Sequence, residues 1–347
     1  MNQIDKKIIM KITIKDIAKA LSVSTGTVSK AMQDYPDIGN ETKKKVKEYA
    51  EKIGYEPNIH ASFLRTKKTK LIGIVVPNLK TNFYSELVGS LIIRITKNGY
   101  LPIVLNSNES EQVEGENLER LMRQKVDGIF ISLTKKTTST DYLKKVMSSS
   151  SSLITFSNTS KVITCNKVVF NDKAIIKRIT EYLINKGNSK IAFVRKSLIS
   201  QNSINQFIGY IEAHEVNKIS IDNLRIIVSK QGTFSEGYRI AKELSNSGVQ
   251  IDSFISYNDP LAIGAMMFYK ENGFNIPKDI RFIGQENSEF GSFFTPELSS
   301  IKQNLSLMAE KIMRLFLEEQ AELKQKKISS FKREEIEAEL IERTSSI

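Results

Sequence analysis

The sequence predicts a small all-α unit at the N-terminus, followed by an α/β body built of two doubly wound parallel sheets. Residues 13–54 carry helix signals at helical spacing and contain no strand-like alternation. From Leu71 onward, short apolar runs typical of buried strands alternate with amphipathic helical stretches. Such alternation predicts parallel sheets that are covered on both faces. Pro57 separates the two regions, because a proline there stops the helical unit from continuing.

Three short helices account for the N-terminal unit. Thr13 is a suitable cap for the first helix, the second begins at Thr25, and the third runs from about Glu41 to a terminator at Gly54. A break at residues 22–24 separates the first two helices. The apolar side chains expected to pack between the helices are Ile17, Ala18, Leu21, Val28, Met32, Val46, Tyr49, Ala50 and Ile53.

Nine strand-like runs follow in the body, more than one sheet comfortably holds, so we expect two subdomains. In doubly wound folds ligands bind at the carboxyl ends of the strands, which is where we look for a site. The runs are Leu71–Val76, Leu101–Leu105, Gly128–Ser132, Leu153–Phe156, Val168–Phe170, Ile191–Val194, Arg225–Val228, Ser253–Ser256 and Arg281–Ile283.

The positive charge of the chain is concentrated at its N-terminus. The net charge is +12, and residues 1–70 contain fourteen lysines and one arginine against eight acidic residues. A basic unit of this kind favours a polyanionic partner. Two helices joined by a tight turn would allow the second helix to enter the major groove of double-stranded DNA. A small helical domain with a solvated polar face is the alternative.

The second helix carries the side chains that suit DNA contacts. Thr25, Thr27 and Ser29 have short hydroxyls for phosphates or base edges, and Lys30 can reach the O6 and N7 atoms of guanine. Gly26 removes a side chain from the middle of this face, so the alternative of a cytosolic ligand-binding protein without DNA binding also stays open.

Composition argues against several other classes. Cys165 has no cysteine partner, and His60 and His214 are too few for a structural zinc site. No stretch approaches the roughly 18 apolar residues of a membrane span, and no signal peptide is recognisable, so we expect a cytoplasmic protein without metal or cofactor. The usual phosphate-loop, dinucleotide, nucleophile-elbow and zinc-protease motifs are missing, so we do not expect an enzyme.

Ordered motifs run along nearly the whole chain. They include TIKDIAKALSVSTGTVSKAM at 13–32, GNET at 39–42, IGYEPN at 53–58, LRTKKT at 64–69, IGIVVP at 72–77, VDGI at 126–129, YND at 257–259, AIGA at 262–265, TPEL at 295–298 and ELIER at 339–343. In this order they resemble the LacI/GalR family of bacterial transcriptional repressors.

This resemblance implies a helix-turn-helix domain at 1–57, a hinge helix and linker at 58–70, and an effector-binding and dimerisation domain at 71–347. The hinge helix would place Ala61 near the minor groove and Leu64 as a wedge between base pairs, although Leu64 could also be a linker residue packed on the body. A helix of only two turns is unstable alone in water, because helix nucleation is costly. We therefore expect the hinge helix to form only when it is paired with its copy on DNA. The expected DNA contacts are Thr13, Ser24, Thr25, Gly26, Thr27, Ser29, Lys30, Ala61, Leu64 and Arg65.

For the body, the resemblance implies a fold like that of periplasmic sugar-binding proteins. An N-subdomain of about 71–166 plus 301–326 and a C-subdomain of about 167–300 plus 327–347 would enclose a ligand cleft. Ligand binding would alter how two copies pack and thereby control operator affinity, which is allostery. We expect a homodimer rather than a coiled-coil tetramer, because no heptad repeat follows Arg343.

The family's cleft residues carry over only in part. The expected effector contacts are Phe83, Tyr84, Asn202, Gln206, Asn258, Asp259 and Glu286. Gln206 stands where the family typically has an arginine, and Ser157-Asn158 and Asn171-Asp172 also depart from its pattern. Without the charged guanidinium fork, a neutral effector, with carbohydrate as the leading class, is favoured over an anionic one.

Three alternatives remain for the cleft. The pocket could be degenerate, with regulation by a partner protein or by none. Asn258 could simply form the loop that carries it. Glu286 could belong to a surface ion pair.

Overall fold

The computed structural model divides the chain into two compact units, Met1–Thr69 and Lys70–Ile347, which we call the headpiece and the body. The described residues are 12–32, 34–55, 68–135, 137, 141–198, 200–325 and 330–347.

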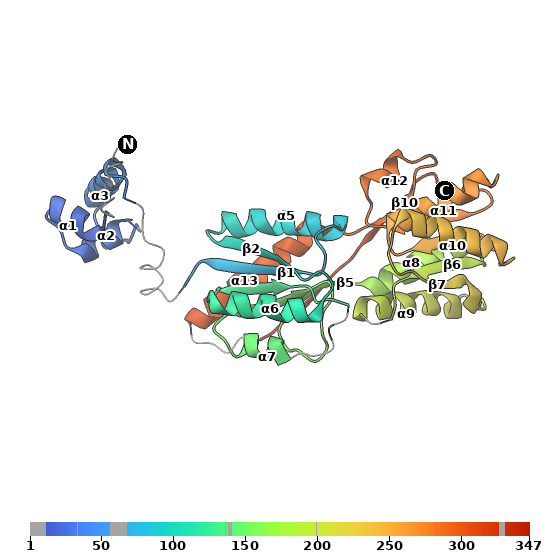
Figure 1. Ribbon diagram of the computed structural model, residues 1–347, viewed down its shortest axis with the longest axis horizontal. Helices are drawn as coiled ribbons and strands as arrows, with labels where there is room; N and C mark the ends of the chain where they lie inside the picture. Colours follow the sequence, from blue (N-terminus) through green and yellow to red (C-terminus); the bar gives the residue numbers. More distant parts are fainter. Residues whose placement is uncertain are drawn as a thin grey trace, which may run out of the picture. The chain divides into compact units, whose positions relative to one another are not determined.

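The headpiece contains the three helices that the sequence predicts. They are α1 (Ile14–Ala20), α2 (Thr25–Met32) and α3 (Asn40–Lys52) (Figure 1). Buried side chains from all three helices form one small core, with Ile17 and Val28 fully buried. Gly54 ends the unit with φ at +68°, a backbone conformation that favours glycine.

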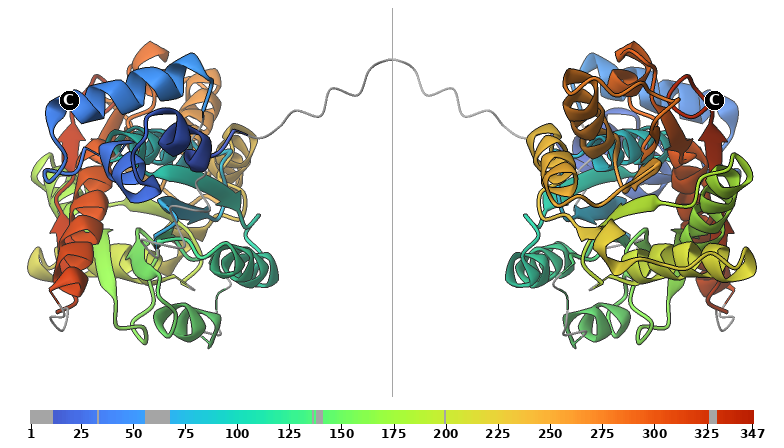
Figure 2. Two further views of the ribbon diagram at one scale, coloured as in Figure 1. Left: turned by 90° about the vertical axis from the view of Figure 1, so that its left-hand side faces the viewer. Right: turned by 90° about the vertical axis from the view of Figure 1, so that its right-hand side faces the viewer.

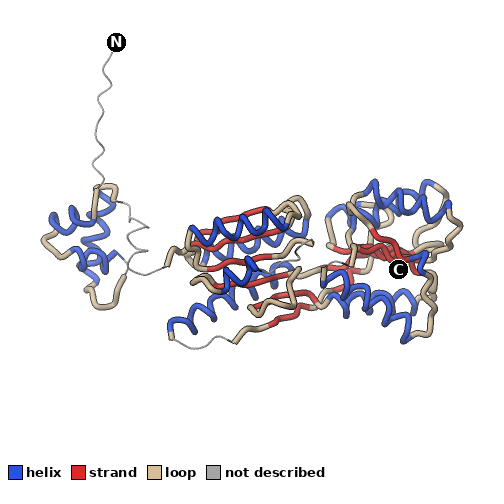
Figure 3. The backbone as a smooth tube through the Cα atoms, turned by 60° about the horizontal axis from the view of Figure 1, so that its bottom comes forward, coloured by secondary structure: helices blue, strands red, loops and turns tan. Residues whose placement is uncertain are grey.

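The body contains two six-stranded sheets, which confirms the predicted pair of doubly wound subdomains. The first sheet consists of β1 (Leu71–Val76), β2 (Leu101–Asn106), β3 (Gly128–Ile131), β4 (Ser152–Phe156), β5 (Asn166–Phe170) and β11 (Arg333–Ile336). The second consists of β6 (Ile191–Arg195), β7 (Ile226–Val228), β8 (Ser253–Ser256), β9 (Arg281–Gln285), β10 (Ser299–Lys302) and β12 (Glu339–Ile341). Strands lie inside each subdomain and helices outside (Figure 3).

The two sheets have equivalent strand orders, β11-β5-β4-β3-β1-β2 and β12-β10-β9-β8-β6-β7. Neighbouring strands pair in parallel, except that β12 runs antiparallel to β10 at the edge of the second sheet. The short β12 therefore departs from the all-parallel expectation.

Helices cover both faces of each sheet, as the end-on views show (Figure 2). In the first subdomain, α5 (Asn82–Lys97) and α13 (Leu305–Lys324) cover one face and α6 (Glu111–Arg123) and α7 (Asp141–Met147) the other. In the second, α8 (Asp172–Asn185) and α9 (Gln201–Val216) lie opposite α10 (Phe234–Asn246) and α11 (Asp259–Glu271). A short α12 (Glu289–Phe293) and a 3-10 turn (Asn223–Arg225) complete the set.

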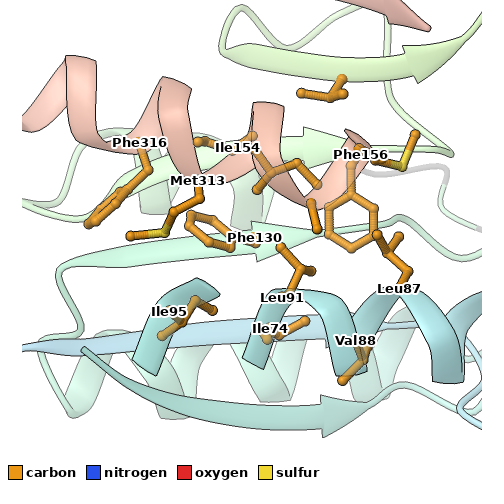
Figure 4. Close-up of a cluster of buried hydrophobic side chains, with 14 of the residues drawn as sticks. Ile74, Leu87, Val88, Leu91, Ile95, Phe130, Ile154, Phe156, Met313 and Phe316 are labelled. Atoms are coloured by element: carbon orange, nitrogen blue, oxygen red, sulfur yellow. The ribbon is translucent and has the colours of Figure 1, made fainter. Parts of the chain in front are cut away.

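One core of the first subdomain lies between the sheet and the two helices on one face, α5 and α13 (Figure 4). Leu91 of α5 and Met313 of α13 point toward the strands, and the Phe316 ring meets the Phe130 ring edge-on with centroids 5.6 Å apart. Gly128 makes room for this pair, because a Cβ there would lie 2.6 Å from the Phe316 ring. Tight packing of this kind holds the strand ends in register for the site.

Sheet membership corrects the predicted subdomain boundaries. The expected C-subdomain of residues 167–300 and 327–347 is wrong for two strands, because β5 and β11 both belong to the first sheet. Arg333–Ile336 of β11 pairs with Lys167–Phe170 of β5, so these two strands lie side by side at that edge. The apolar composition of β5 is compatible with a place in either sheet. Only its pairing with neighbouring strands determines the sheet to which it belongs.

In the described part of the chain, the backbone passes between the two sheets at three places, after β5, after β10 and after β11. Two of these connections are joined by hydrogen bonds. The Asn171 amide donates to the Ile336 carbonyl at 3.0 Å, and the Asn171 side chain donates to Glu337 at 2.9 Å.

Candidate functional site

In the headpiece, α2 presents the polar face that the sequence predicts. Thr25, Gly26 and Lys30 are exposed, whereas Thr27 and Ser29 are half-buried rather than fully exposed. Val28 and Ala31 of the same helix are buried in the headpiece core. The opposite faces of α2 therefore serve packing and solvent contact, as a recognition helix requires.

Hydrogen bonds within the headpiece already engage several of the predicted DNA-contact side chains. The Ser24 Oγ accepts from the Thr27 amide at 2.9 Å and lies 2.9 Å from the Thr27 hydroxyl, so Ser24 caps α2. The Thr13 hydroxyl and amide both donate to Asp16 at 2.7 Å.

The sequence predicts that Lys30 contacts guanine, but in this structure its side chain is paired within the headpiece. Its ammonium forms an exposed ion pair with Asp37. The hydrogen bond from Lys30 also lowers the pKa of Asp37. Contact with a base would have to replace this pair, and exposed pairs are weak enough to exchange. The expected contacts Ala61, Leu64 and Arg65 lie outside the described residues.

The body contains a cleft of about 210 Å³ that is lined by both of its subdomains. Lining residues follow the carboxyl ends of strands in each sheet, which is where doubly wound folds place ligands. The lining residues used below are Phe83, Tyr84, Glu109, Lys135, Asp172, Lys196, Asn202, Gln206, Gln231, Gly232, Tyr257, Asn258, Gln285 and Glu286. Six of the seven residues predicted for the effector are among them.

Phe83 and Tyr84, two of the three aromatic residues of the lining, are the ones that the sequence predicts; the third is Tyr257. Their rings meet edge-on at 5.0 Å, and Phe83 also contacts Phe170 of β5 at 6.4 Å. The Tyr84 hydroxyl lies 2.9 Å from the Ser132 hydroxyl, and burial raises the pKa of Tyr84 to about 12. Both rings are thus held in place by the first subdomain, and Tyr84 stays protonated at neutral pH.

Gln206 lies at the cleft on α9, where its side chain is buried. Its Nε2 donates to Asp172 Oδ1 and to Gln285 Oε1, at 3.2 Å each. Gln206 therefore connects the start of α8 with the end of β9 through its amide. Burial raises the pKa of Asp172 to about 7, and the hydrogen bond from Gln206 opposes that rise.

Asn258 lines the cleft, but its amide is used by the protein. Its Oδ1 accepts from the Leu261 amide at 3.2 Å and caps α11, and its Nδ2 donates to the Gly232 carbonyl at 2.8 Å. This geometry favours the loop-forming alternative for Asn258. The position of Gly232 is tight, because a Cβ there would lie 2.8 Å from Asn258 Nδ2.

Asp259 is a correction, because it does not line the cleft. Its side chain is fully buried, and its oxygens accept from the Ser300 hydroxyl and the Ser288 amide at 2.6 Å each. The carboxylate thus ties the start of α11 to β10 and to the loop after β9. Of these two adjacent residues, Asn258 lines the cleft and Asp259 is buried in the subdomain.

Glu286 lines the cleft at the end of β9 with a strained backbone. Its φ is +102°, and its amide donates to the Ile301 carbonyl at 3.0 Å. Strain of this kind persists where neighbouring structure enforces it, which is common at binding sites. Burial raises the pKa of Glu286 to about 7, partly offset by Lys196. The alternative of a surface ion pair for Glu286 is not what the structure shows, because the described residues give it no ion pair.

Sequence reasoning missed several charged groups of the cleft. Lys196 follows β6, and its ammonium lies 4.7 Å from the centroid of the Tyr257 ring. Lys135 follows β3 and lies 3.6 Å from Glu109. No motif marks these loop positions, so only the fold brings them together. The cleft therefore contains two lysine ammonium groups, although Gln206 stands where the family typically has an arginine.

The described residues contain no group of three His, Cys, Asp or Glu side chains that could hold a metal ion. Within that same part of the chain, no helix is long and apolar enough to cross a lipid bilayer. His214 is buried in α9, where its Nδ1 lies 2.9 Å from the Tyr210 carbonyl.

Comparison with known proteins identifies the family. Residues 69–342 match the family described as periplasmic binding proteins and sugar binding domain of LacI family. Residues 13–58 match bacterial regulatory proteins of the lacI family. The chain belongs to the LacI family. This confirms the resemblance seen in the sequence: the protein is a LacI-family DNA-binding transcriptional regulator with a sugar-binding type of body.

Curated relatives of this LacI-family chain match it over most or all of their own length. Catabolite control protein A of Staphylococcus xylosus is 28% identical over 85% of this chain and 88% of that protein. The HTH-type transcriptional regulator RegA of Clostridium saccharobutylicum is 28% identical over 97% of this chain and 100% of its own. The Lac repressor dimer bound to operator and the anti-inducer ONPF has the same fold, with a TM-score of 0.83 at 21% identity, covering 97% and 99% of the two chains.

Proposed function

We propose that this LacI-family regulator is a repressor that binds a palindromic operator as a homodimer, with its affinity controlled by a small sugar in the body cleft. The observation that carries the proposal is the cleft itself, where loops of both subdomains bring aromatic, amide and carboxyl groups together. A ligand held by both subdomains can favour one arrangement of them over another. That differential contact is what allosteric control of DNA binding requires.

The headpiece supports the DNA-binding half of the proposal through charge and shape. Residues 1–70 carry fourteen lysines and one arginine against eight acidic residues, and α2 keeps its polar face exposed. Neutralising DNA phosphates releases counterions, so affinity should fall steeply with salt. The proposed hinge helix at 58–64 lies outside the described residues and stays a prediction.

A gel-shift titration with the full chain and a palindromic operator tests this half. Between 50 and 200 mM salt, we expect affinity to fall by about 10³-fold or more if six or more phosphates are contacted. Affinity that does not change over this range would contradict the proposal. A scrambled DNA of the same length is the control for sequence specificity.

The effector half is tested by ligand-dependent stabilisation of the same protein. A panel of monosaccharides is added during thermal unfolding, because a ligand that binds only the folded state raises the midpoint. Any sugar that raises the midpoint should also change operator affinity. If no sugar acts, the proposed sugar control is wrong.

A degenerate cleft with control by a partner protein is the second candidate. One observation favours it: the amides of Asn258 and Gln206 are already engaged within the protein. Against it stand two cleft groups: the buried Gln285 Nε2, which has no hydrogen-bond partner, and the Lys196 ammonium, which lies over the Tyr257 ring.

A further inference from the structure

The cleft contains an ammonium, that of Lys196, without a close ion pair. Among the described residues, none of the ion pairs within 4.0 Å involves Lys196, and its ammonium lies 4.7 Å from the centroid of the Tyr257 ring. Burial lowers the pKa of Lys196, as does Lys135, while Glu286, Glu109 and Asp172 act in the opposite direction. A desolvated cation without close pairing is costly, and a bound anion would relieve that cost.

A second donor in the same cleft also lacks an acceptor. Gln285 is 4% exposed, and its Nε2 has no hydrogen-bond partner, while its Oε1 accepts from Gln206. Buried polar atoms in native proteins are nearly always paired, so this donor in the cleft is available to an acceptor on a ligand. It is independent of Lys196, because it lies on a different strand and is uncharged.

Three helices begin at the cleft and add to its positive potential. The N-caps of α5, α9 and α11 are Thr81, Ser200 and Asn258, and all three line it. The N-terminal end of a helix carries a partial positive charge and favours a nearby anion. The carboxyl groups of the buried Asp172 and the half-buried Glu286 need not oppose this, because burial raises the pKa of each to about 7. The third carboxylate of the cleft, Glu109, lies 3.6 Å from the Lys135 ammonium.

We propose that the effector is a sugar acid, a monosaccharide-sized polyol whose carboxylate pairs with Lys196 and whose hydroxyls bind Gln285, Asp172 and Glu286. This inference rests on the proposed sugar-binding function and replaces the sequence-based expectation of a neutral ligand. The cleft volume of about 210 Å³ is below the roughly 300 Å³ at which small-molecule sites usually begin, which suits one sugar ring. The Lys196 ammonium acts as a point charge and supplies the positive charge that Gln206 lacks in place of the family's arginine.

The test uses matched pairs of sugars with the full chain. D-glucuronate is compared with D-glucose, and D-galacturonate with D-galactose, by calorimetric titration and thermal unfolding, with D-glucose 6-phosphate as a second anion. We expect at least one acid to bind about tenfold or more tightly than its neutral partner, since a charge-assisted hydrogen bond adds about 1.5 kcal/mol or more. This comparison needs no variant.

Lys196→Met then assigns the effect to the ammonium. We expect it to weaken sugar-acid binding about ten- to hundredfold and to change neutral-sugar binding by less than about threefold. Lys186→Met is the matched control, because the Lys186 ammonium also lies over a ring, that of Tyr182 at 5.3 Å, but Lys186 does not line the cleft. It should leave both affinities unchanged.

The outcomes separate the two proposals. If neutral sugars bind as tightly as the acids, or if Lys196→Met weakens both equally, the sugar-acid inference is overturned and the sugar-sensing function stands. Tighter binding of the sugar phosphate than of the acids overturns the carboxylate assignment. If none of the sugars binds, the proposed function fails, and the inference fails with it.

Acidic ligands should also show a characteristic pH profile. An anion beside Asp172 and Glu286 favours their protonated forms, so binding takes up protons and affinity should rise as pH falls from 8 to 6. The groups that face Asp172 are Gln206, Lys196 and Glu335, and those that face Glu286 are Lys196 and Asp259. An affinity that falls over this range would contradict the inference.

Discussion

Glu236 is a single buried carboxylate that shapes one wall of the cleft. It accepts hydrogen bonds from the Ser229 hydroxyl and from the amides of Lys230, Gln231 and Gly232, at 2.6 to 2.8 Å. Two of these residues, Gln231 and Gly232, line the cleft. Burial alone would raise the pKa of Glu236, but these bonds outweigh it and lower the pKa to about 2. The anion therefore orders the loop after β7.

Glu236→Gln should lower the free energy of unfolding by about 2 kcal/mol, because an amide cannot accept four bonds as the anion does. The pKa is lowered on folding, so this stabilisation is complete above the ordinary value of 4.5 and is lost as pH falls toward 2. Urea unfolding of the full chain at pH 7 and across pH 5 to 3 measures both effects.

Glu243→Gln on the same helix is the control, since Glu243 is exposed and pairs with exposed Arg239, which also lies 3.5 Å from Glu236. It should change the free energy of unfolding by less than about 0.5 kcal/mol. Equal effects of the two substitutions would show that the Glu236 bonds contribute little.

The individual cleft residues show what a sequence can and cannot predict. Phe83, Tyr84 and Gln206 were predicted from the resemblance to the family's cleft positions, and the cleft contains them. Asp259 was misplaced, since adjacent residues at a helix start can point in different directions. Lys196 was missed because it stands in a loop without a motif, and only the packing of β6 against its neighbours directs it to the cleft.

At the scale of the element, α2 depends on its cap. Ser24→Ala removes the side chain that accepts from the Thr27 amide, which should destabilise α2 by about 1 kcal/mol. Operator affinity should then fall severalfold, measured by gel shift with the full chain. Ser24→Asn keeps a capping oxygen and should retain most of the affinity. Equal loss in both variants would indicate instead that the Ser24 hydroxyl contacts DNA directly.

The pairing of α10 with α11 depends on two glycines. A Cβ at Gly264 would overlap the Phe234 carbonyl oxygen, and one at Gly237 would overlap the Leu261 carbonyl oxygen. The two backbones therefore approach more closely than side chains permit. Both helices pack on the apolar core of the second subdomain, which includes Phe254 of β8. The spacing of the helices therefore also affects the position of β8.

Gly264→Ala should therefore lower the free energy of unfolding by about 1–3 kcal/mol, as overpacking does. Gly115→Ala in α6 is the matched control, because its nearest atoms, on Tyr142, would be at an ordinary 3.7 Å. That change should be neutral or stabilising by up to about 1 kcal/mol. Thermal and urea unfolding compare the two, and a stable Gly264→Ala protein would show that the helices can separate freely.

Strands were predictable where their composition was apolar. The run at Leu71–Val76 was placed correctly as a buried strand, with parallel neighbours on both sides. The edge strand β11, with the sequence REEI, was missed because three of its four residues are charged. Its position in the sheet depends on pairing with β5, which is distant in the sequence. The local pattern of residue types does not predict such long-range pairing.

For the molecule as a whole, the exposed apolar side chains of the body suggest where two copies meet. Ile92 and Ile93 of α5 are 36% and 67% exposed, and Leu101 of β2 is 62% exposed. In the other subdomain, Phe290 and Phe293 of α12 are 67% and 83% exposed. Figure 1 draws α5 and α12 along the same edge of the body. Grouped apolar exposure of this kind is typical of an interface.

If these faces form the dimer, Ile93→Glu should convert the protein to monomers, because it places a charge in an apolar contact. Light scattering measures the mass, and gel shift measures the loss of operator binding. Operator affinity should fall together with dimer content, since two linked headpieces bind far more tightly than one.

Leu224→Glu is the matched control, because Leu224 is also 67% exposed but lies in the 3-10 turn before β7. It should leave both the mass and the operator affinity unchanged. A monomeric Ile93→Glu protein that still binds the operator as tightly as the parent would show that each headpiece acts alone. A dimeric Ile93→Glu protein would place the interface on another face of the body.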